Sequence, residues 1–276
     1  MAYFLGIDIG GTVIKSGLYD ERGNEKAVAA LNDPAVAGPV GWSERDMHAM
    51  WRTVCASVRR VLAEGGVPPS EIRGVGFSAH GKGLYAVDRD GEPVRNGIIS
   101  SDNRALPQVR AWKAAGVDHA AYPYACQQVW AGHPVSLLAW LKANEAAAYR
   151  RIHRILMAHD WIRYRLTGEF AAEITNISGS NLFNVDTGAY EPELLRLFGI
   201  EEMQDCTAPV VGSAECLAGV SARAAEETGL AAGTPVYGGF FDVVSAAVCA
   251  GLADQRFINV VMGTWTIATW IADSIP

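Results

Sequence analysis

A glycine turn between two apolar runs constrains the fold of this chain more than any other feature of its sequence. Residues 4–9 form a short apolar run that ends in Gly10-Gly11-Thr12, and a second apolar run follows at once over residues 13–19. Short apolar runs separated by glycines predict two β-strands joined by a tight turn. We therefore expect the chain to begin with a β-hairpin.

The same turn carries the residue types of a phosphate-binding loop. Gly10 and Gly11 let backbone N–H groups approach an anion closely, Thr12 adds a hydroxyl donor, and Lys15 follows shortly after. Asp8, near the end of the first strand, is placed to organise Mg²⁺, which prefers one or two carboxylates together with phosphate oxygens and water. The alternative is an ordinary hairpin turn that contains these residues by chance.

The next segments extend this hairpin into a larger α/β unit. Residues 26–31 form a third candidate strand, and apolar residues recur at helical spacing from Met47 to Leu62, before Gly65-Gly66. Residues 72–79 predict a further strand. The expected order is β-β-β-α-β.

The middle of the chain, residues 102–230, is mainly helical in pattern, with helices expected over 136–150, 160–166 and 217–228. The pattern then repeats the beginning of the chain. Residues 257–262 and 265–271 are apolar runs on either side of Gly263-Thr264, as residues 4–9 and 13–19 are on either side of the first glycine turn. This similarity predicts a weak internal duplication.

Asp242 is a second candidate for chemistry. It follows Gly238-Gly239 after an apolar strand and begins a helix of small residues, so its carboxylate is expected near a helix N-terminus in a glycine-lined crevice. A plain N-cap aspartate is the alternative. Together with Asp8 and the two Gly-Thr turns, however, it supplies the metal ligand, phosphate cradle and base that phosphoryl transfer requires.

Polar residues at strand ends and in loops are candidates for binding the hydroxyls of a sugar, although surface or capping roles are the alternative for each. Trp130 stands in a less regular segment and is a candidate for stacking on a sugar ring, with packing as its alternative. The other candidates are His80, Lys82, Asp102, Arg104 and Asp160.

Composition excludes several classes of protein. The 276 residues are 50% hydrophobic and 19% charged, which argues against disorder. With 23 Lys and Arg against 30 Asp and Glu, the net charge of −7 argues against a nucleic-acid partner or an anionic membrane surface. Five scattered cysteines without a CxxC motif indicate neither a disulfide framework nor a zinc site. Because no apolar run approaches a membrane span, we expect a cytoplasmic protein.

These motifs together resemble the FGGY carbohydrate kinases, whose fold is the actin-like, ribonuclease-H-like ATPase fold. Four sequence segments carry the resemblance, in chain order: residues 6–12, the segment 156–169 with its Leu-Thr-Gly, residues 238–242, and Met262-Gly263-Thr264. Within the family, residues 41–47, 81–84, 100–105 and 132–138 are similar to L-xylulose kinases.

The resemblance implies a role for each matching residue. Asp242 matches the catalytic base, and Asp8 matches the aspartate linked to the metal, which Asp242 is also expected to contact. The first phosphate loop is matched by Gly10, Gly11, Thr12 and Lys15, and the second by Gly263 and Thr264.

At the sugar site the sequence departs from the D-xylulose kinases. Lys82 stands where those enzymes have a substrate-binding histidine, and Gly81 replaces the preceding methionine. The resemblance therefore implies an ATP- and Mg²⁺-dependent kinase that phosphorylates the terminal hydroxyl of a ketopentose, with L-xylulose favoured over D-xylulose and 3-keto-L-gulonate.

The resemblance also implies two lobes in an α/β fold with helices on both faces of a mixed sheet. Residues 1–246 match the N-terminal sugar-binding lobe, and residues 247–276 match the start of a C-terminal nucleotide-binding lobe, which we expect to be truncated and incomplete. A homodimer is consistent with the family. Two rivals remain open: a kinase of the repressor-related glucokinase group, and a sugar-binding protein or fragment without catalysis.

Overall fold

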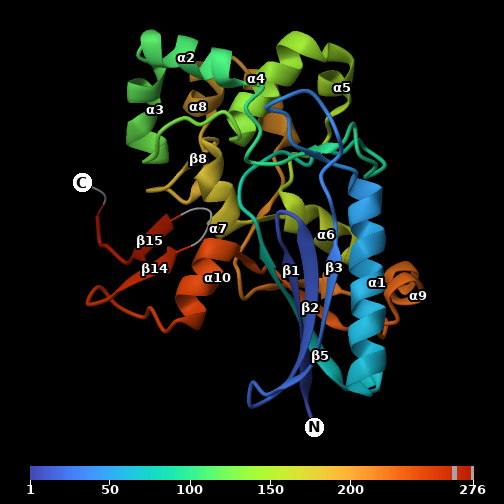
Figure 1. Cartoon of the computed structure of the whole chain (residues 1–276). Helices are drawn as coiled ribbons and strands as arrows, with labels where there is room; N and C mark the ends of the chain where they lie inside the picture. The colour runs from blue at the N-terminus through green and yellow to red at the C-terminus, as the bar shows by residue number, and fades with distance from the viewer. Residues whose placement is uncertain (263–265, 275–276) are drawn as a thin grey trace.

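Seven strands form the central sheet of the computed structural model, which describes residues 1–262 and 266–274. The strands are β1 (Tyr3–Ile9), β2 (Val13–Asp20), β3 (Glu25–Asn32), β5 (Ile72–Ala79), β11 (Cys216–Gly219), β12 (Pro235–Tyr237) and β13 (Phe240–Phe241). Their order is β11-β12-β5-β1-β2-β3, with β13 also paired to β5 (Figure 1). Pairing is antiparallel from β1 to β3 and parallel among β1, β5, β12 and β13. The predicted β-β-β-α-β order and mixed sheet are confirmed.

Alternating burial along β1 explains how helices come to lie on both faces of this sheet. Leu5, Ile7 and Ile9 are buried on one face, whereas Asp8 points to the other, more open face. The buried face packs against α1 (Met47–Gly65), and α6 (Ala158–Thr167) and α9 (Ala222–Thr228) complete that layer. On the opposite face lies α10 (Asp242–Cys249) (Figure 1).

Local signals set the two ends of α1. The carboxylate of Asp46 accepts the backbone N–H of Ala49 at 2.9 Å, which caps the N-terminus. Gly66 adopts φ +61°, the left-handed conformation that closes many helix C-termini. The predicted boundaries of this helix are confirmed.

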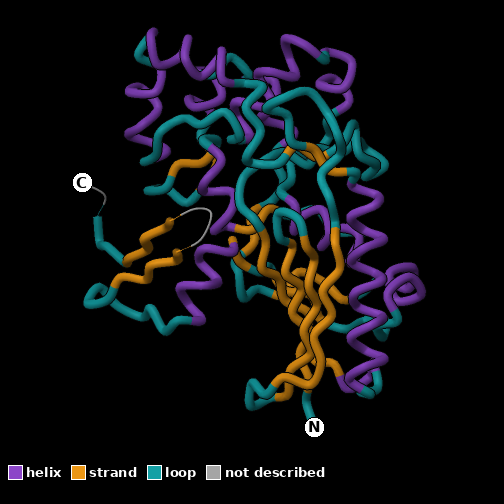
Figure 2. The backbone as a smooth tube through the Cα atoms, in the orientation of Figure 1, coloured by secondary structure: helices purple, strands orange, loops and turns teal. Residues whose placement is uncertain are grey.

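A helical region stands above the sheet in Figure 1 and is separate from it in the backbone trace of Figure 2. It contains α2 (Leu106–Ala114), α3 (Val117–Ala125), α4 (Pro134–Asn144), α5 (Ala146–Arg151) and α8 (Pro192–Leu197). These helices enclose a second hydrophobic core, which includes Leu137, Leu141 and Leu194. The chain therefore builds two adjoining cores, and the ends of the parallel strands face the junction between them.

Short elements connect these two regions. They are β4 (Glu44–Arg45), η1 (Pro69–Glu71), β6 (Gly97–Ile98), β7 (Ala172–Glu173), α7 (Ile174–Ile177), η2 (Ser178–Ser180), β8 (Phe183–Asn184), β9 (Ala189–Tyr190), η3 (Glu201–Cys206) and β10 (Val210–Val211).

The expected helix over residues 217–228 is wrong in its first part. Residues 216–219 form β11, an antiparallel partner of β12, and the helix begins only at Ala222. Ser221 caps it by accepting the N–H of Ala224 at 3.2 Å. The apolar residues 217–219 therefore lie in the edge strand of the sheet and not on the face of a helix.

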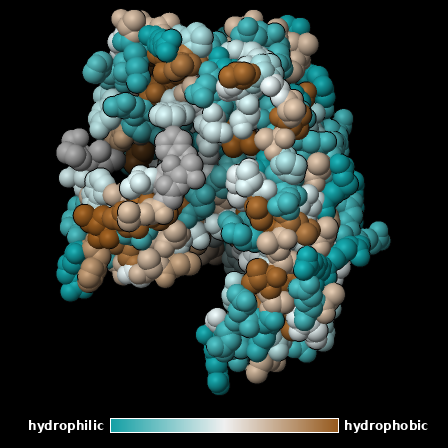
Figure 3. Space-filling model, viewed as in Figure 1, coloured by the Kyte–Doolittle hydropathy of each residue, from teal (hydrophilic) through white to brown (hydrophobic). Residues whose placement is uncertain are grey.

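The last described strands, β14 (Ile258–Met262) and β15 (Thr266–Trp270), pair with each other and not with the central sheet. Large apolar side chains such as Ile258, Met262 and Trp270 are exposed on this hairpin, and Figure 3 shows hydrophobic colour over this part of the surface. Gly263 and Thr264, predicted as the second phosphate loop, lie outside the described residues. Among the helices of the described ranges, none is both long and apolar enough to span a bilayer.

Packing of α1 against the sheet predicts a measurable contrast between two valines. Val54→Ala removes a fully buried side chain from α1 and is expected to lower the free energy of unfolding by about 1.5–3 kcal/mol. Val248→Ala, on the exposed side of α10, is the matched control, since its valine is 53% exposed. Urea denaturation measures both. Equal losses in the two variants would contradict the assigned packing of α1.

Candidate active site

The register of three parallel strands brings Asp8 and Asp242 to one edge of the sheet. Asp8 of β1 pairs with Ser78 of β5, and Ser78 in turn pairs with Phe240 of β13, so Asp242 follows two residues further along. The carboxyl ends of parallel strands meet at the same edge, which is the usual ligand-binding edge of such sheets. The two aspartates that the sequence singled out are therefore neighbours.

Asp242 has the titration behaviour expected of a proton acceptor. Burial and, less strongly, the nearby Asp8 carboxylate together raise the pKa of the Asp242 carboxyl from 3.8 to about 6, against the opposing effect of the Val243 N–H. A carboxylate with a pKa closer to neutrality is a better general base at neutral pH. The structure thus places a half-buried carboxylate with a raised pKa at the start of α10.

Lys15 lies beside Asp8 on the same face. The two residues are paired in the β1–β2 register, and Lys15 Nζ stands 3.8 Å from Asp8 Oδ2. Both side chains remain partly exposed at 55% and 38%, so the ammonium group is available to an anion. They line an open hollow of about 460 Å³ that also includes Ser78, Gly239 and Ser245. Figure 3 shows an indentation between the α10 side and the lower sheet.

The glycine turn is held from behind by a buried arginine. The guanidinium of Arg45, 1% exposed, donates to the carbonyl oxygens of Gly11 and Gly10 and to the carboxylate of Asp33. The turn closes with the Gly10 N–H donating to Val13 O at 3.0 Å. A Cβ at Gly10 would lie 2.7 Å from that same oxygen, so this position requires glycine.

Gly11 and Thr12 are exposed at the tip of this turn. Of the residues predicted to bind phosphate, only Lys15 lines the hollow together with Asp8 within the described residues. Gly10, Gly11 and Thr12 form the β1–β2 turn that follows Asp8 along the chain, and Gly263 and Thr264 lie outside the described residues.

The carboxylates of Asp8 and Asp242 fit a magnesium ion. Mg²⁺ takes one or two protein carboxylates and completes its octahedron with water and phosphate oxygens. Within residues 1–262 and 266–274, no group of three His, Cys, Asp or Glu side chains gathers that could hold a metal by itself. Two carboxylates without a third protein ligand suit an ion that is shared with a bound phosphate.

His80, Gly81 and Lys82 come directly after β5 at the same edge. His80 is buried, its Nε2 lies 3.1 Å from the Tyr85 hydroxyl, and burial together with Arg45 lowers its pKa to about 4. The imidazole is therefore neutral at pH 7. Lys82 has φ +63°, and burial lowers the pKa of its ammonium group.

Asp102 and Arg104 bind each other. The guanidinium of Arg104 donates to both carboxylate oxygens of Asp102 at 2.9 and 2.8 Å, and it lies 3.8 Å from the ring centre of Trp42. Asp102 also accepts the N–H of Ser43 at 2.6 Å. The Nη1 atom of Arg104 is buried and has no hydrogen-bond partner among the residues that the structure describes. Trp130, 47% exposed, lies in the loop before α4.

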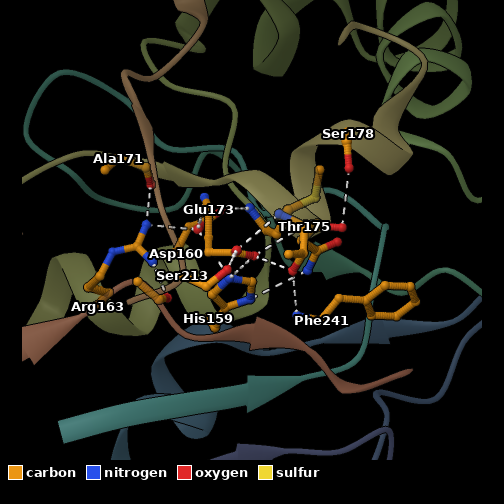
Figure 4. Close-up of polar contacts among 12 residues, drawn as sticks. His159, Asp160, Arg163, Ala171, Glu173, Thr175, Ser178, Ser213 and Phe241 are labelled. Carbon is orange, nitrogen blue, oxygen red and sulfur yellow. Dashed lines mark hydrogen bonds and ion pairs between the residues drawn. The ribbon is translucent and has the colours of Figure 1, made fainter. Parts of the chain in front are cut away.

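Asp160 lies in the interior of the described chain. Its carboxylate accepts the backbone N–H groups of Met157 and Glu173 at 2.9 and 3.0 Å and pairs with Arg163 at 2.8 Å. Figure 4 shows the contacts of Asp160 with Arg163 and Glu173. As a sugar-binding residue Asp160 stays a prediction.

Sequence reasoning missed the residues around this carboxylate. Three of them are buried: Arg163, Glu173 and Asn176. Arg163 and Thr175 contact the segment 238–241, and Asn176 contacts the chain just after β5. Two signals were present in the sequence: Asp160 and Arg163 stand at i, i+3 in α6, and Glu173 precedes Thr175-Asn176 at capping distance.

Comparison with known proteins identifies the family. A model described as "FGGY family of carbohydrate kinases, N-terminal domain" matches residues 3–249. The chain belongs to the FGGY family. Membership of the FGGY family excludes the repressor-related glucokinase alternative.

A relative from Escherichia coli strain K12 named "L-xylulose/3-keto-L-gulonate kinase" is 46% identical over 269 residues, which cover 98% of this chain and 54% of the relative. The chain thus spans about half the length of the curated relatives it matches.

Two solved structures share the fold of this FGGY chain. A ligand-bound xylulose kinase from Lactobacillus acidophilus superposes with a TM-score of 0.91 at 21% identity, covering 97% of this chain and 54% of that one. A xylulose kinase from Rhodospirillum rubrum gives a TM-score of 0.87 at 25% identity, covering 94% and 52%. The predicted actin-like ATPase fold is confirmed.

The raised pKa of Asp242 predicts a pH-dependent stability. Between pH 4 and pH 6 the folded protein holds a proton on Asp242 that the unfolded chain has lost, so this group destabilises the fold as pH rises through that window. Relative to Asp242→Asn, the wild type should therefore lose thermal stability between pH 4 and pH 7 in metal-free buffer.

Asp254→Asn is the control for this comparison. Hydrogen bonds from Arg256 lower the pKa of Asp254, so its contribution has the opposite sign. Melting temperatures of the three proteins across pH measure the effect. A difference between wild type and Asp242→Asn that does not change with pH would contradict the raised pKa.

Proposed function

We propose that this protein is an ATP-dependent sugar kinase that transfers the γ-phosphoryl group to the terminal hydroxyl of a ketopentose. One observation carries the proposal: the half-buried carboxylate of Asp242, with its raised pKa, lies at the strand edge where Asp8 and the glycine turn also meet. The named activity of the E. coli relative and membership of a carbohydrate kinase family support it.

The proposed chemistry assigns one task to each group. The Asp242 carboxylate accepts the proton of the sugar hydroxyl while the hydroxyl oxygen attacks the γ-phosphorus and the bond to the ADP oxygen breaks. Lys15 and the backbone N–H groups of the glycine turn bind phosphate oxygens and stabilise their charge. Mg²⁺, held by Asp8 and Asp242, neutralises phosphate charge when bound.

L-xylulose is the proposed substrate. Gly81 and Lys82 depart from the methionine and histidine of D-xylulose kinases, and the E. coli relative carries L-xylulose in its name. We further propose that the sugar contacts come from His80, Gly81, Lys82, Asp102, Arg104, Trp130 and Asp160.

The proposed organisation follows the family. Residues 1–246 form the sugar-binding lobe, and residues 247–276 belong to the nucleotide-binding lobe together with the second phosphate loop at Gly263 and Thr264. A cytoplasmic location, where ATP is available, and a homodimer complete the proposal.

An ADP-release assay over pentoses and hexoses tests this function, on the longest natural form of the protein. Turnover should be fastest with L-xylulose. Asp242→Asn should lower kcat by about 10²- to 10⁴-fold with little change in the sugar KM, since the base acts on the transition state. Asp90→Asn, at an exposed turn, is the matched control.

Two outcomes would contradict the proposal. A wild-type rate in Asp242→Asn removes the base assignment. Calorimetric binding of L-xylulose without detectable turnover or nucleotide binding favours the sugar-binding protein without catalysis.

A further inference from the structure

The peptide that precedes the base is held by a side chain from a distant segment. Phe241 N–H donates to Thr175 Oγ1 at 2.9 Å, across 66 positions of sequence. Phe241 is the N-cap residue of α10, with φ −58° and ψ 135°, and Asp242 is the first residue of that helix. This hydrogen bond therefore fixes the backbone from which the Asp242 carboxylate projects.

The Thr175 hydroxyl is oriented by Glu173. A hydroxyl has one proton, and Thr175 Oγ1 donates it to Glu173 Oε2 at 2.7 Å. The oxygen lone pairs are then free to accept the Phe241 N–H. Without the carboxylate, the same hydroxyl could turn its proton toward that N–H and repel it.

Glu173 is fully buried and still ionised. Its carboxylate accepts the N–H groups of Thr175 and Asn176 at 2.9 and 3.2 Å and the hydroxyl of Ser213 at 2.6 Å. Burial raises the pKa of Glu173, but the nearby His159, the Ser213 hydroxyl and the Thr175 N–H outweigh it and leave that pKa lowered. At neutral pH the group is therefore an acceptor only.

The segment before Asp242 begins at Gly238, and a side chain of α6 holds that residue. Arg163 donates to Gly238 O at 2.7 Å, and it is itself paired with Asp160 at 2.8 Å. Asp160 also accepts the backbone N–H of Glu173 at 3.0 Å. The contacts at Gly238 and at Phe241 are therefore both linked to the buried carboxylate of Asp160. Figure 4 shows this chain of contacts running from Arg163 to Phe241.

We propose that Thr175 and Glu173 are positioning residues for Asp242, acting through the backbone N–H of Phe241. This inference rests on the proposed kinase function, in which Asp242 is the base. Neither residue touches a reacting atom in this scheme. Their effect is to keep the base at a fixed place relative to the sugar hydroxyl, because a displacement of about 1 Å is enough to slow such a reaction strongly.

A role confined to capping α7 accounts for only part of these contacts. As N-cap, Glu173 satisfies the backbone N–H groups of Thr175 and Asn176. That task needs neither the Thr175 hydroxyl nor Phe241. The hydroxyl connects the cap directly to the peptide that precedes Asp242, and it can be removed without removing the cap.

Thr175→Val tests the inference, because it preserves side-chain shape and removes the hydroxyl. Hydrogen exchange at the Phe241 amide, measured by NMR without substrate, should accelerate at least about 10-fold. With L-xylulose and ATP, kcat should fall about 10- to 100-fold while the sugar KM changes less than about twofold. Thr175→Ser restores the hydroxyl and should restore both quantities.

Thr228→Val is the matched control. Like Thr175, Thr228 has a hydroxyl that donates one hydrogen bond, here to Ala224 O, and accepts a backbone N–H, here from Leu230; it is buried at the end of α9. This variant should lower stability without changing Phe241 exchange or kcat. Glu173→Gln is a second route to the same result if Thr175→Val does not fold, because an amide can donate to the hydroxyl and reverse its orientation.

Unchanged Phe241 exchange in both Thr175→Val and Glu173→Gln overturns the inference. So does a loss confined to KM, or an equal loss of kcat in Thr228→Val. If the wild type phosphorylates no sugar, the proposed function fails, and the amide exchange alone decides whether Thr175 holds the segment before Asp242.

Discussion

Parallel pairing of β5 with β1 on one side and with β13 on the other is the constraint on which this site depends. It sets the ends of three strands at one edge, so residues separated by more than 230 positions, Asp8 and Asp242, become neighbours. Local turns then position the candidate side chains at this edge. The β1–β2 turn is closed by Gly10 and backed by Arg45, and the chain after β13 enters α10 directly at Asp242.

This edge needs rigid support, and the support is ionic. Asp160, Arg163 and Glu173 are all 0% exposed. Burying charges costs free energy, and a buried pair often stabilises a fold no better than apolar residues of the same size would. What such groups supply here is direction: the guanidinium of Arg163 and the carboxylate of Glu173 each hold a defined backbone or hydroxyl group. The buried charges thus fix geometry at the base, while the two hydrophobic cores supply the stability.

The sequence predicted the parts of the site that are local. The glycine turn, Asp8, and Asp242 at a helix start are each visible within ten residues, because turn and capping chemistry is local. It failed where partners come from elsewhere. Residues 217–219 have the apolar content of a helix face, yet pairing with β12 makes them part of β11. Thr175 reads as part of a polar connector because its partner, Phe241, lies 66 residues away.

Phe241, which precedes the proposed base, also limits the size of the residue at position 81. Gly81 packs against the ring of Phe241 so closely that a Cβ there would lie 2.2 Å from Cε2 of that ring. Any larger residue at position 81 therefore requires the Phe241 ring to move, and Phe241 is also the residue whose backbone N–H donates to Thr175 Oγ1. The residue at position 81 is thus in direct contact with the residue that precedes the proposed base, so the size of one limits the position of the other.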